Sequence, residues 1–147
     1  MGEVLLRKGS VAAATDIFSH ILDSQRGVLG ESHPTIMSTK VNLGKANTQL
    51  GEFKVAQSLL QDVIFIYTEW WGRRHPDTMR VVDELASAFM VEGEHTMALG
   101  VCAASEFQSA EELWKEALDF YEDTYGNQSD MAGRIKTNLH YLYSLKL

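Results

Sequence analysis

The sequence is poor in the residues that mark secreted and membrane proteins. Among its 147 residues there is one cysteine, Cys102, which excludes an internal disulfide and is typical of a reducing compartment. No apolar run approaches the roughly 18 residues that span a bilayer. The N-terminus, MGEVLLRKGS, lacks the long apolar region of a signal peptide. These absences predict a cytoplasmic protein with no membrane partner.

Motifs of catalysis and metal binding are also missing. The five histidines include no pair spaced i, i+4, and the sequence has no HExxH, CxxC, GxSxG, phosphate-binding glycine loop, dinucleotide fingerprint or acid-rich calcium loop. Glu111, Glu112 and Glu116 could act as paired carboxylates, but amphipathic helices commonly place such acids in water. We interpret Cys102 as a small buried residue on a helix. The sequence therefore predicts no enzyme, no catalytic or metal site and no cofactor.

Positive charge is scarce in the second half of the chain. The formal net charge is −7, and residues 75–147 hold 5 Lys or Arg against 13 Asp or Glu. Eight of these acids lie between Glu106 and Asp130, where Lys115 is the one basic residue. We interpret this acidic stretch as the solvated face of a helix. Because the sequence has no basic stripe, it predicts no nucleic-acid partner.

The residues that are present repeat with a period of 42. His33-Pro34 returns as His75-Pro76, and these two prolines are the only ones in the chain. Three sets of small residues keep the same register: Gly9, Gly51 and Gly93; Ala14, Ala56 and Ala98; and Gly30 and Gly72. Periods of this size indicate stacked supersecondary units.

Each repeat predicts a pair of antiparallel helices. Proline is tolerated in the first helical turn, and glycine ends helices because it adopts the left-handed conformation. The first complete repeat therefore predicts helix A over residues 34–50, a tight turn at Gly51-Glu52, and helix B over residues 53–71. The next repeat predicts a helix A over residues 76–92, which Gly93 ends.

These residues resemble the 42-residue tetratricopeptide repeat of kinesin light chains and of related repeat tails in fungal proteins. The matching motifs are Gly-x-x-His-Pro, Asn42-Leu43-Gly44, Gly51-Glu52-Phe53-x-x-Ala56 and a closing Gly72, then Leu85-Ala86 and Gly93-Glu94-x-x-x-Ala98. The likeness covers roughly residues 9 to 98. It implies an all-α fold: a right-handed superhelical stack of antiparallel helix hairpins, a tetratricopeptide-like solenoid of about six helices.

We predict a single helical-repeat domain over residues 1–147. It would contain a partial repeat at 1–29, repeats at 30–71 and 72–125, and a partial repeat at 126–147. In the partial repeat at 1–29, residues 2–8 are predicted to end a helix A, with Gly9 in the turn. Residues 11–29 would then form helix B, with its buried side made by Ala14, Ile17, Phe18, Ile21 and Leu22. The sequence thus opens part-way through a repeat. In the last, Ser129 or Asp130 is predicted to cap a helix A.

The repeat at 72–125 is twelve residues longer than the period requires. Ala98 and Ala110 both match the helix B alanine, which places the extra residues between them. Because residues 101–125 contain no glycine or proline, we predict one long helix over residues 96–125. Twelve residues leave the apolar stripe about 120° out of phase with whole turns. A kink or break near residues 105–109 is therefore the alternative.

Both ends of the predicted stack would expose apolar side chains. Phe18 and Leu22 would lose part of their cover, because the helix A before them is cut short. The last helix A has no following helix B, which would leave open Ile135, Leu139, Leu142, Tyr143 and Leu145. Exposed apolar faces favour association. We therefore predict self-association through the uncapped ends, by the C-terminal face first.

The resemblance also implies that helices A line a concave surface that binds a peptide or partner protein. The family's groove positions fall on Ser38, Asn42, Lys45, Gln49, Arg80, Asp83, Ser87, Arg134, Asn138 and Tyr141, with Val41, Glu84 and Thr137 beside them. Asparagine can bond a peptide backbone in both directions, and the basic side chains favour an acidic segment. Trp70 is expected at a seam between repeats, whereas Trp71 is the freer candidate for a partner contact. The sequence thus predicts a non-catalytic protein–protein interaction module. The alternative is a structural spacer or oligomerising segment of a larger repeat-containing sensor or adaptor protein.

Overall fold

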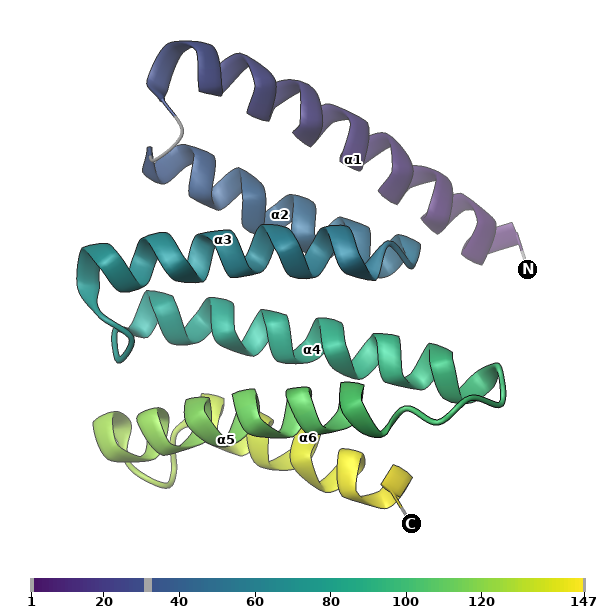
Figure 1. The fold of residues 1–147 in the computed structure, drawn as a ribbon, viewed down its shortest axis with the longest axis vertical. Coiled ribbons are helices and arrows are strands. Elements are labelled where there is room, and N and C mark those ends of the chain that lie inside the picture. Colours follow the sequence, from purple (N-terminus) through teal and green to yellow (C-terminus); the bar gives the residue numbers. More distant parts are fainter. Residues whose placement is uncertain (1, 31–32, 147) are drawn as a thin grey trace. The chain divides into compact units, whose positions relative to one another are not determined.

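Six α-helices and no strand make up the part of the chain that the structure describes (Figure 1). The computed structural model describes residues 2–30 and 33–146, with side chains at 11–28, 30 and 33–145. The chain divides into two compact units, Met1–Ile66 and Tyr67–Leu147, and the boundary falls within one helix, α3 (Phe53–Trp71). The all-α prediction is confirmed.

The first unit contains α1 (Gly2–Leu29), α2 (Pro34–Leu50) and most of α3, and α1 and α2 form an antiparallel hairpin (Figure 1). The predicted bounds of α2 and α3 are confirmed. The Nδ1 atom of His33 caps α2 by accepting the backbone N–H of Thr35 at 3.2 Å. Gly51 ends α2 with a φ of 85°, a conformation that favours glycine. Gly44 of α2 lets the side chain of Leu60 on α3 approach closely.

Two predictions for the first helix are wrong. Residues 2–29 form one continuous helix, so Gly9 makes no turn. A separate helix of seven residues would be too short to hold itself, and continuing the helix satisfies its backbone groups instead. Leu22 is buried, but Ile17 and Ile21 are 58% and 38% exposed, although both were predicted on the buried side. Both isoleucines lie on the side of α1 that α2 does not cover.

The second unit contains the end of α3, then α4 (Pro76–Ala98), α5 (Ala104–Tyr125) and α6 (Asp130–Lys146). Helix α5 packs against both α4 and α6 (Figure 1). His75 caps α4 as His33 caps α2, because its Nδ1 accepts the backbone N–H of Asp77 at 3.1 Å. The predicted cap of α6 is also found, since Ser129 Oγ accepts the N–H of Ala132 at 3.1 Å.

The longer repeat is built differently from either prediction. Helix α4 continues past Gly93 to Ala98, and the chain turns over residues 99–103, so the single helix over 96–125 is wrong and the break lies before residues 105–109. The extra residues lengthen both helices of the hairpin, because α4 has 23 residues against 17 in α2, and α5 has 22 against 19 in α3. Gly93 is buried beneath the ring of Phe107. Cys102, predicted to be buried on a helix, is exposed in the turn.

The predicted open face of the last helix is instead largely buried. Ile135 and Leu142 are fully buried and Leu139 is 7% exposed, because α6 turns this apolar stripe toward the neighbouring helices of its own unit. Tyr143 is 41% exposed, and its hydroxyl donates to Glu111 of α5 at 3.0 Å. The expected self-association through this face therefore loses its basis.

Tryptophans 70 and 71 lie in an aromatic group at the end of α3. The ring of Trp71 stacks on His75 at 4.8 Å between centroids and lies 4.9 Å from the ring of Tyr67. Trp70 and Trp71 are 37% and 45% exposed. Trp71 is thus the more exposed of the two, as expected, but it is already stacked on the residue that caps α4.

Candidate functional site

A pocket of about 480 Å³ lies in the second unit where α4 and α6 begin and α5 ends. The helix starts at Pro76 and Ser129 bring the first turns of two helices A to one place, and the last turn of a helix B closes the side. The lining residues are Pro76, Arg80, Glu84, Tyr121, Tyr125, Ser129, Asp130, Met131 and Arg134. The pocket therefore combines two cations, two carboxylates and two aromatic rings.

The two arginines of the pocket are held by carboxylates but keep much of their surface in solvent. Arg80 donates from Nη2 to Asp77 Oδ1 at 2.7 Å, and its side chain is 66% exposed. Arg134 donates from Nη2 to Asp83 Oδ2, and its side chain is 53% exposed. A guanidinium has five N–H donors. Each arginine is therefore oriented at one nitrogen while presenting further N–H groups to the pocket.

Asp83 is the buried carboxylate that holds Arg134 in place. It is 1% exposed, and its Oδ1 accepts the indole N–H of Trp114 at 2.9 Å while Oδ2 accepts from Arg134. A buried carboxylate needs such donors, because leaving it unpaired costs several kcal/mol. Asp83 was predicted to contact a partner, but its carboxylate is buried and bonded to two side chains of its own unit. It orients Arg134 and does not face outward.

Two tyrosines at the end of α5 complete the pocket. Tyr121 is buried, Tyr125 is 55% exposed, and their rings stack with centroids 6.1 Å apart. Burial raises the pKa of Tyr121 above its ordinary value of 10.0, Arg80 opposes this shift, and Tyr125 and Asp77 add to it. Sequence reasoning missed both tyrosines because it assigned the surface to helices A alone. Their i, i+4 spacing just before Gly126 was the available signal.

The raised pKa gives a testable pH dependence. The unfolded chain ionises Tyr121 near 10.0, whereas the folded protein keeps the phenol neutral to higher pH. Its contribution to the free energy of unfolding should therefore be complete below pH 10.0 and be lost as the pH rises through the folded-state pKa. Phenolate absorbance of the wild type and of Tyr121→Phe should show that the missing titration lies above that value. Because Arg80 lowers this pKa, Arg80→Ala should move the titration higher. A titration at or below the ordinary value would contradict the assignment.

The pocket unites only some of the predicted contact residues. Arg80 and Arg134 line it, together with Glu84, while Ser87, Asn138 and Tyr141 are not among its lining residues. Ser87 and Asn138 are half-buried on α4 and α6, and Tyr141 is 48% exposed. In the first unit, one exposed stripe of α2 carries the other four predicted residues, Ser38, Asn42, Lys45 and Gln49.

The described residues hold no group of three or more His, Cys, Asp or Glu side chains arranged to bind a metal ion. None of the helices formed by these residues combines the length and apolarity needed to cross a bilayer. The chemistry that the pocket does offer is hydrogen bonding, ion pairing and aromatic contact.

Comparison with known proteins identifies the architecture. Residues 1–69 match the tetratricopeptide repeat family. A kinesin-light-chain-type protein of Podosopora anserina with nearly identical TPR-like repeats superposes with a TM-score of 0.76 at 21% identity, over 93% of this chain. The chain has a tetratricopeptide repeat fold. The resemblance to kinesin light chain-type repeats is thus confirmed at the level of the fold.

Two further structures share this tetratricopeptide repeat fold. BtubC (BKLC) from P. vanneervenii gives a TM-score of 0.72 at 18% identity over 97% of this chain. A single-substitution variant of the Podosopora repeats gives 0.57 at 19% identity, covering 94% of this chain and 79% of that one. The chain spans 59% of the first Podosopora structure and 51% of BtubC. No curated protein matches the sequence significantly.

Proposed function

We propose that the pocket at the start of α4 and α6 binds an extended peptide segment of a partner protein, and that the chain acts as a non-catalytic interaction module in the cytoplasm. The observation that carries the proposal is the grouping of Arg80 and Arg134 with Glu84 and Asp130 around one pocket. A peptide backbone offers N–H donors and C=O acceptors alternately, so a site with both guanidinium donors and carboxylate acceptors suits it.

The tyrosines and arginines favour particular side chains on that peptide. Tyr125 is 55% exposed and supplies an aromatic surface at the rim. Arg80 keeps most of its side chain in solvent, and a guanidinium binds carboxylates in bidentate geometry. An acidic residue of the peptide against Arg80, next to an apolar or aromatic residue against Tyr125, is the preferred pattern. We extend the same role to the exposed stripe of α2, where Asn42 and Lys45 offer related chemistry.

Selection of peptides from a displayed random library tests this function. The selected peptides should be enriched in Asp or Glu beside an aromatic residue. Arg80→Ala and Tyr125→Ala should each weaken binding of the synthesised peptides by about tenfold, which corresponds to losing one charge-assisted or aromatic contact. Isothermal titration calorimetry of each variant gives the dissociation constants.

Matched variants outside the pocket provide the control. Arg26→Ala on α1 and Phe65→Ala on α3 remove exposed side chains of the same kinds, and both should leave the dissociation constants unchanged within twofold or so. Equal weakening by both pairs of variants would reject the pocket as the site. A library that yields no binding peptide would favour the alternative role as a structural spacer.

A further inference from the structure

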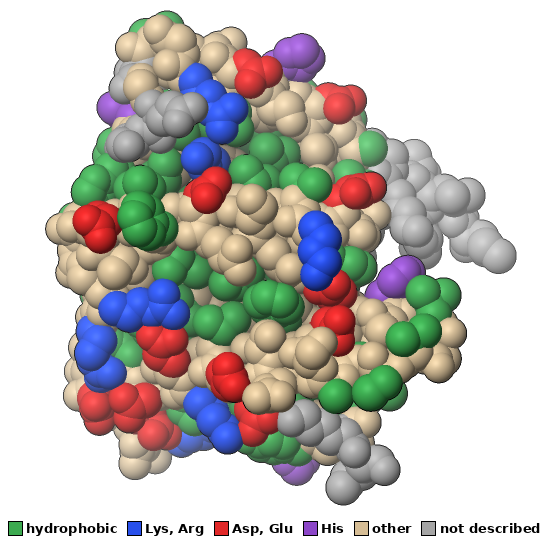
Figure 2. All heavy atoms as spheres, in the orientation of Figure 1, with side chains coloured by type: hydrophobic (Ala, Val, Ile, Leu, Met, Phe, Trp, Pro, Cys, Tyr) green, Lys and Arg blue, Asp and Glu red, His purple; other side chains and the backbone are tan. Residues whose placement is uncertain are grey.

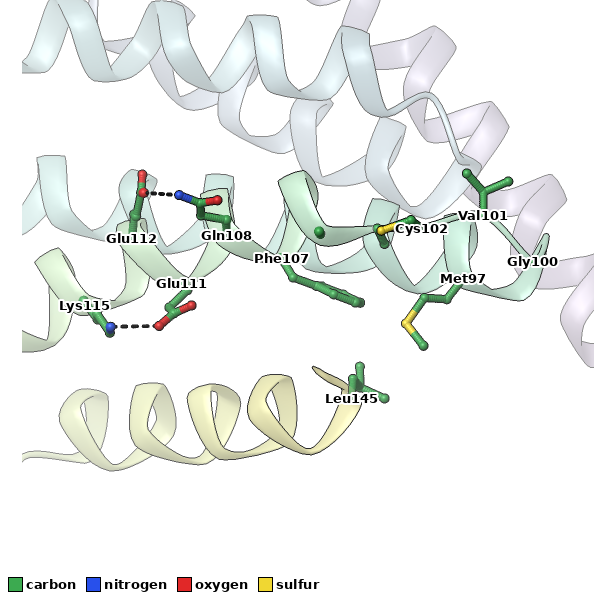
Figure 3. A pocket seen from close by; sticks show the side chains of 12 residues that line it. Met97, Gly100, Val101, Cys102, Phe107, Gln108, Glu111, Glu112, Lys115 and Leu145 are labelled. Atoms are coloured by element: carbon green, nitrogen blue, oxygen red, sulfur yellow. Dashed lines mark hydrogen bonds and ion pairs between the residues drawn. The ribbon is translucent and has the colours of Figure 1, made fainter. Parts of the chain in front are cut away.

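The far end of the α4–α5 hairpin carries a second pocket, of about 910 Å³. It is formed by the last turn of α4, the turn at residues 99–103 and the first three turns of α5. The end of α6 closes it at Leu145 (Figure 3). None of its lining residues belongs to the pocket at the start of α4 and α6 or to the exposed stripe of α2.

The floor of this pocket is apolar and partly open to solvent. Figure 3 shows Met97, Phe107 and Leu145 pointing into one space from three segments of the unit. Phe107 is buried, but Met97 and Val101 are 42% and 57% exposed, and the adjacent Leu99 is 68% exposed. Figure 2 shows hydrophobic side chains gathered at this end of the hairpin, at the right of the view. Exposed apolar side chains grouped in this way mark interaction surfaces rather than ordinary surface.

The lining of the pocket carries more negative than positive charge, because it contains the carboxylates of Glu111 and Glu112 and one cation, Lys115. Glu111 and Glu112 line the pocket and point to different sides of α5 (Figure 3). Lys115 binds Glu111 at 2.8 Å, so these two charges offset each other and Glu112, which accepts an N–H of Gln108 at 3.1 Å, supplies the remaining negative charge of the lining. An occupant with positive charge beside an apolar face matches this rim.

The part of α5 that lines the pocket has the length of a short helix. The residues of α5 that line it run from Ala104 to Lys115, which at 1.5 Å per residue is about 17 Å or three helical turns. An amphipathic helix of similar length would lie along this stripe with its apolar face on Met97, Phe107 and Leu145. We propose that the end of the α4–α5 hairpin is a second docking surface, which binds a basic amphipathic helix of a partner protein. The two surfaces thus select partners of opposite charge.

Synthetic peptides provide the first test. The probe is a helix of roughly 12 residues with leucines at i, i+4 and i+7 and lysines on the other face. One control peptide has the same composition in scrambled order, so its leucines share no face. A second control replaces the lysines by glutamates. Fluorescence anisotropy measures binding to the whole chain, and we expect the amphipathic lysine peptide to bind at least about tenfold more tightly than either control.

Cys102 reports where the peptide binds. It lines this pocket, it is exposed, and it is the only cysteine of the chain, so its alkylation by iodoacetamide can be followed without other labels. Saturating amphipathic lysine peptide should slow the alkylation several-fold, and the scrambled peptide should leave the rate unchanged. Binding without protection of Cys102 would place the peptide elsewhere and overturn the proposal. Equal binding of the scrambled peptide would show general attraction to an acidic protein, and would overturn it too.

Matched variants distinguish binding at this pocket from general attraction by charge or hydrophobicity. Glu112→Lys and Val101→Asp should each weaken peptide binding by about three- to tenfold, as expected for one partly exposed ion pair or apolar contact. Glu69→Lys and Val55→Asp make the same changes at exposed positions of α3 and should have no such effect. Circular dichroism confirms that each variant is folded. An equal effect of the paired variants would reject this surface.

Discussion

Replacing Asp83 by alanine is expected to lower the free energy of unfolding by about 2–4 kcal/mol. The carboxylate is 1% exposed and accepts from both Trp114 and Arg134. Alanine would leave the indole N–H of Trp114 buried without an acceptor, and an empty space in place of the carboxylate. The side chain of Arg134 is 53% exposed, so water can solvate it again. The loss should therefore lie below that of a fully enclosed ion pair.

The control for Asp83→Ala is the same substitution in an exposed ion pair. Asp123 is 66% exposed and accepts from Arg74 at 3.2 Å, so Asp123→Ala should cost less than about 1 kcal/mol. Asp83→Asn retains an oxygen for Trp114 and loses the charge opposite Arg134, so an intermediate loss is expected. Urea denaturation followed by circular dichroism gives all three values. Equal losses for Asp83→Ala and Asp123→Ala would contradict the anchoring role of Asp83.

Asp83 also shows what the sequence could not predict about the site. Two of the groove positions carried over from the family, Arg80 and Arg134, line the pocket. The same positions include Asp83, which lies on the same helix as Arg80. Its donors, Trp114 and Arg134, are 31 and 51 residues further along the chain. A helical pattern gives the face on which a residue lies, but long-range packing decides whether the carboxylate meets water or an indole N–H.

The fold was predictable where local chemistry alone ends a helix. His33-Pro34 and Gly51 set the bounds of α2, and Gly72 follows the end of α3, because each of these residues acts within a few positions of the chain. Prediction failed where tertiary contacts decided. Ile135 and Leu142 are buried on the apolar stripe of α6, which packs against α5. The sequence pattern shows that a stripe is apolar, but it does not show which helix covers it.

Gly93 is the clearest case, because it keeps the 42-residue register of Gly51 but does a different task. Gly51 has a φ of 85° and ends its helix, whereas Gly93 lies within α4 and does not have a positive φ. A Cβ atom placed on Gly93 would lie 2.5 Å from Cε1 of Phe107, which is itself buried. The glycine is required for the close approach of α5, and this approach lets the lengthened hairpin pack.

Gly93→Val should therefore lower the free energy of unfolding by about 2–3 kcal/mol, because the ring of Phe107 must move in a packed core. Gly133 of α6 provides the matched control, since nothing lies within 4 Å of its Cβ position. Gly133→Val should change the stability by less than about 0.5 kcal/mol or raise it slightly, because valine has the higher helix propensity. Thermal and urea denaturation measure both variants.

A double-mutant cycle ties the loss at Gly93 to Phe107. In a Phe107→Ala background the ring is gone, so Gly93→Val should cost less than about 1 kcal/mol, and the two substitutions should be strongly non-additive. Phe107 also forms the floor of the second pocket. Gly93→Val should therefore displace that floor and weaken binding of the amphipathic lysine peptide. Binding of peptides to the pocket at the start of α4 and α6 should be unaffected. A full additive loss in the double variant would mean that Gly93 is needed for a reason other than the approach of Phe107.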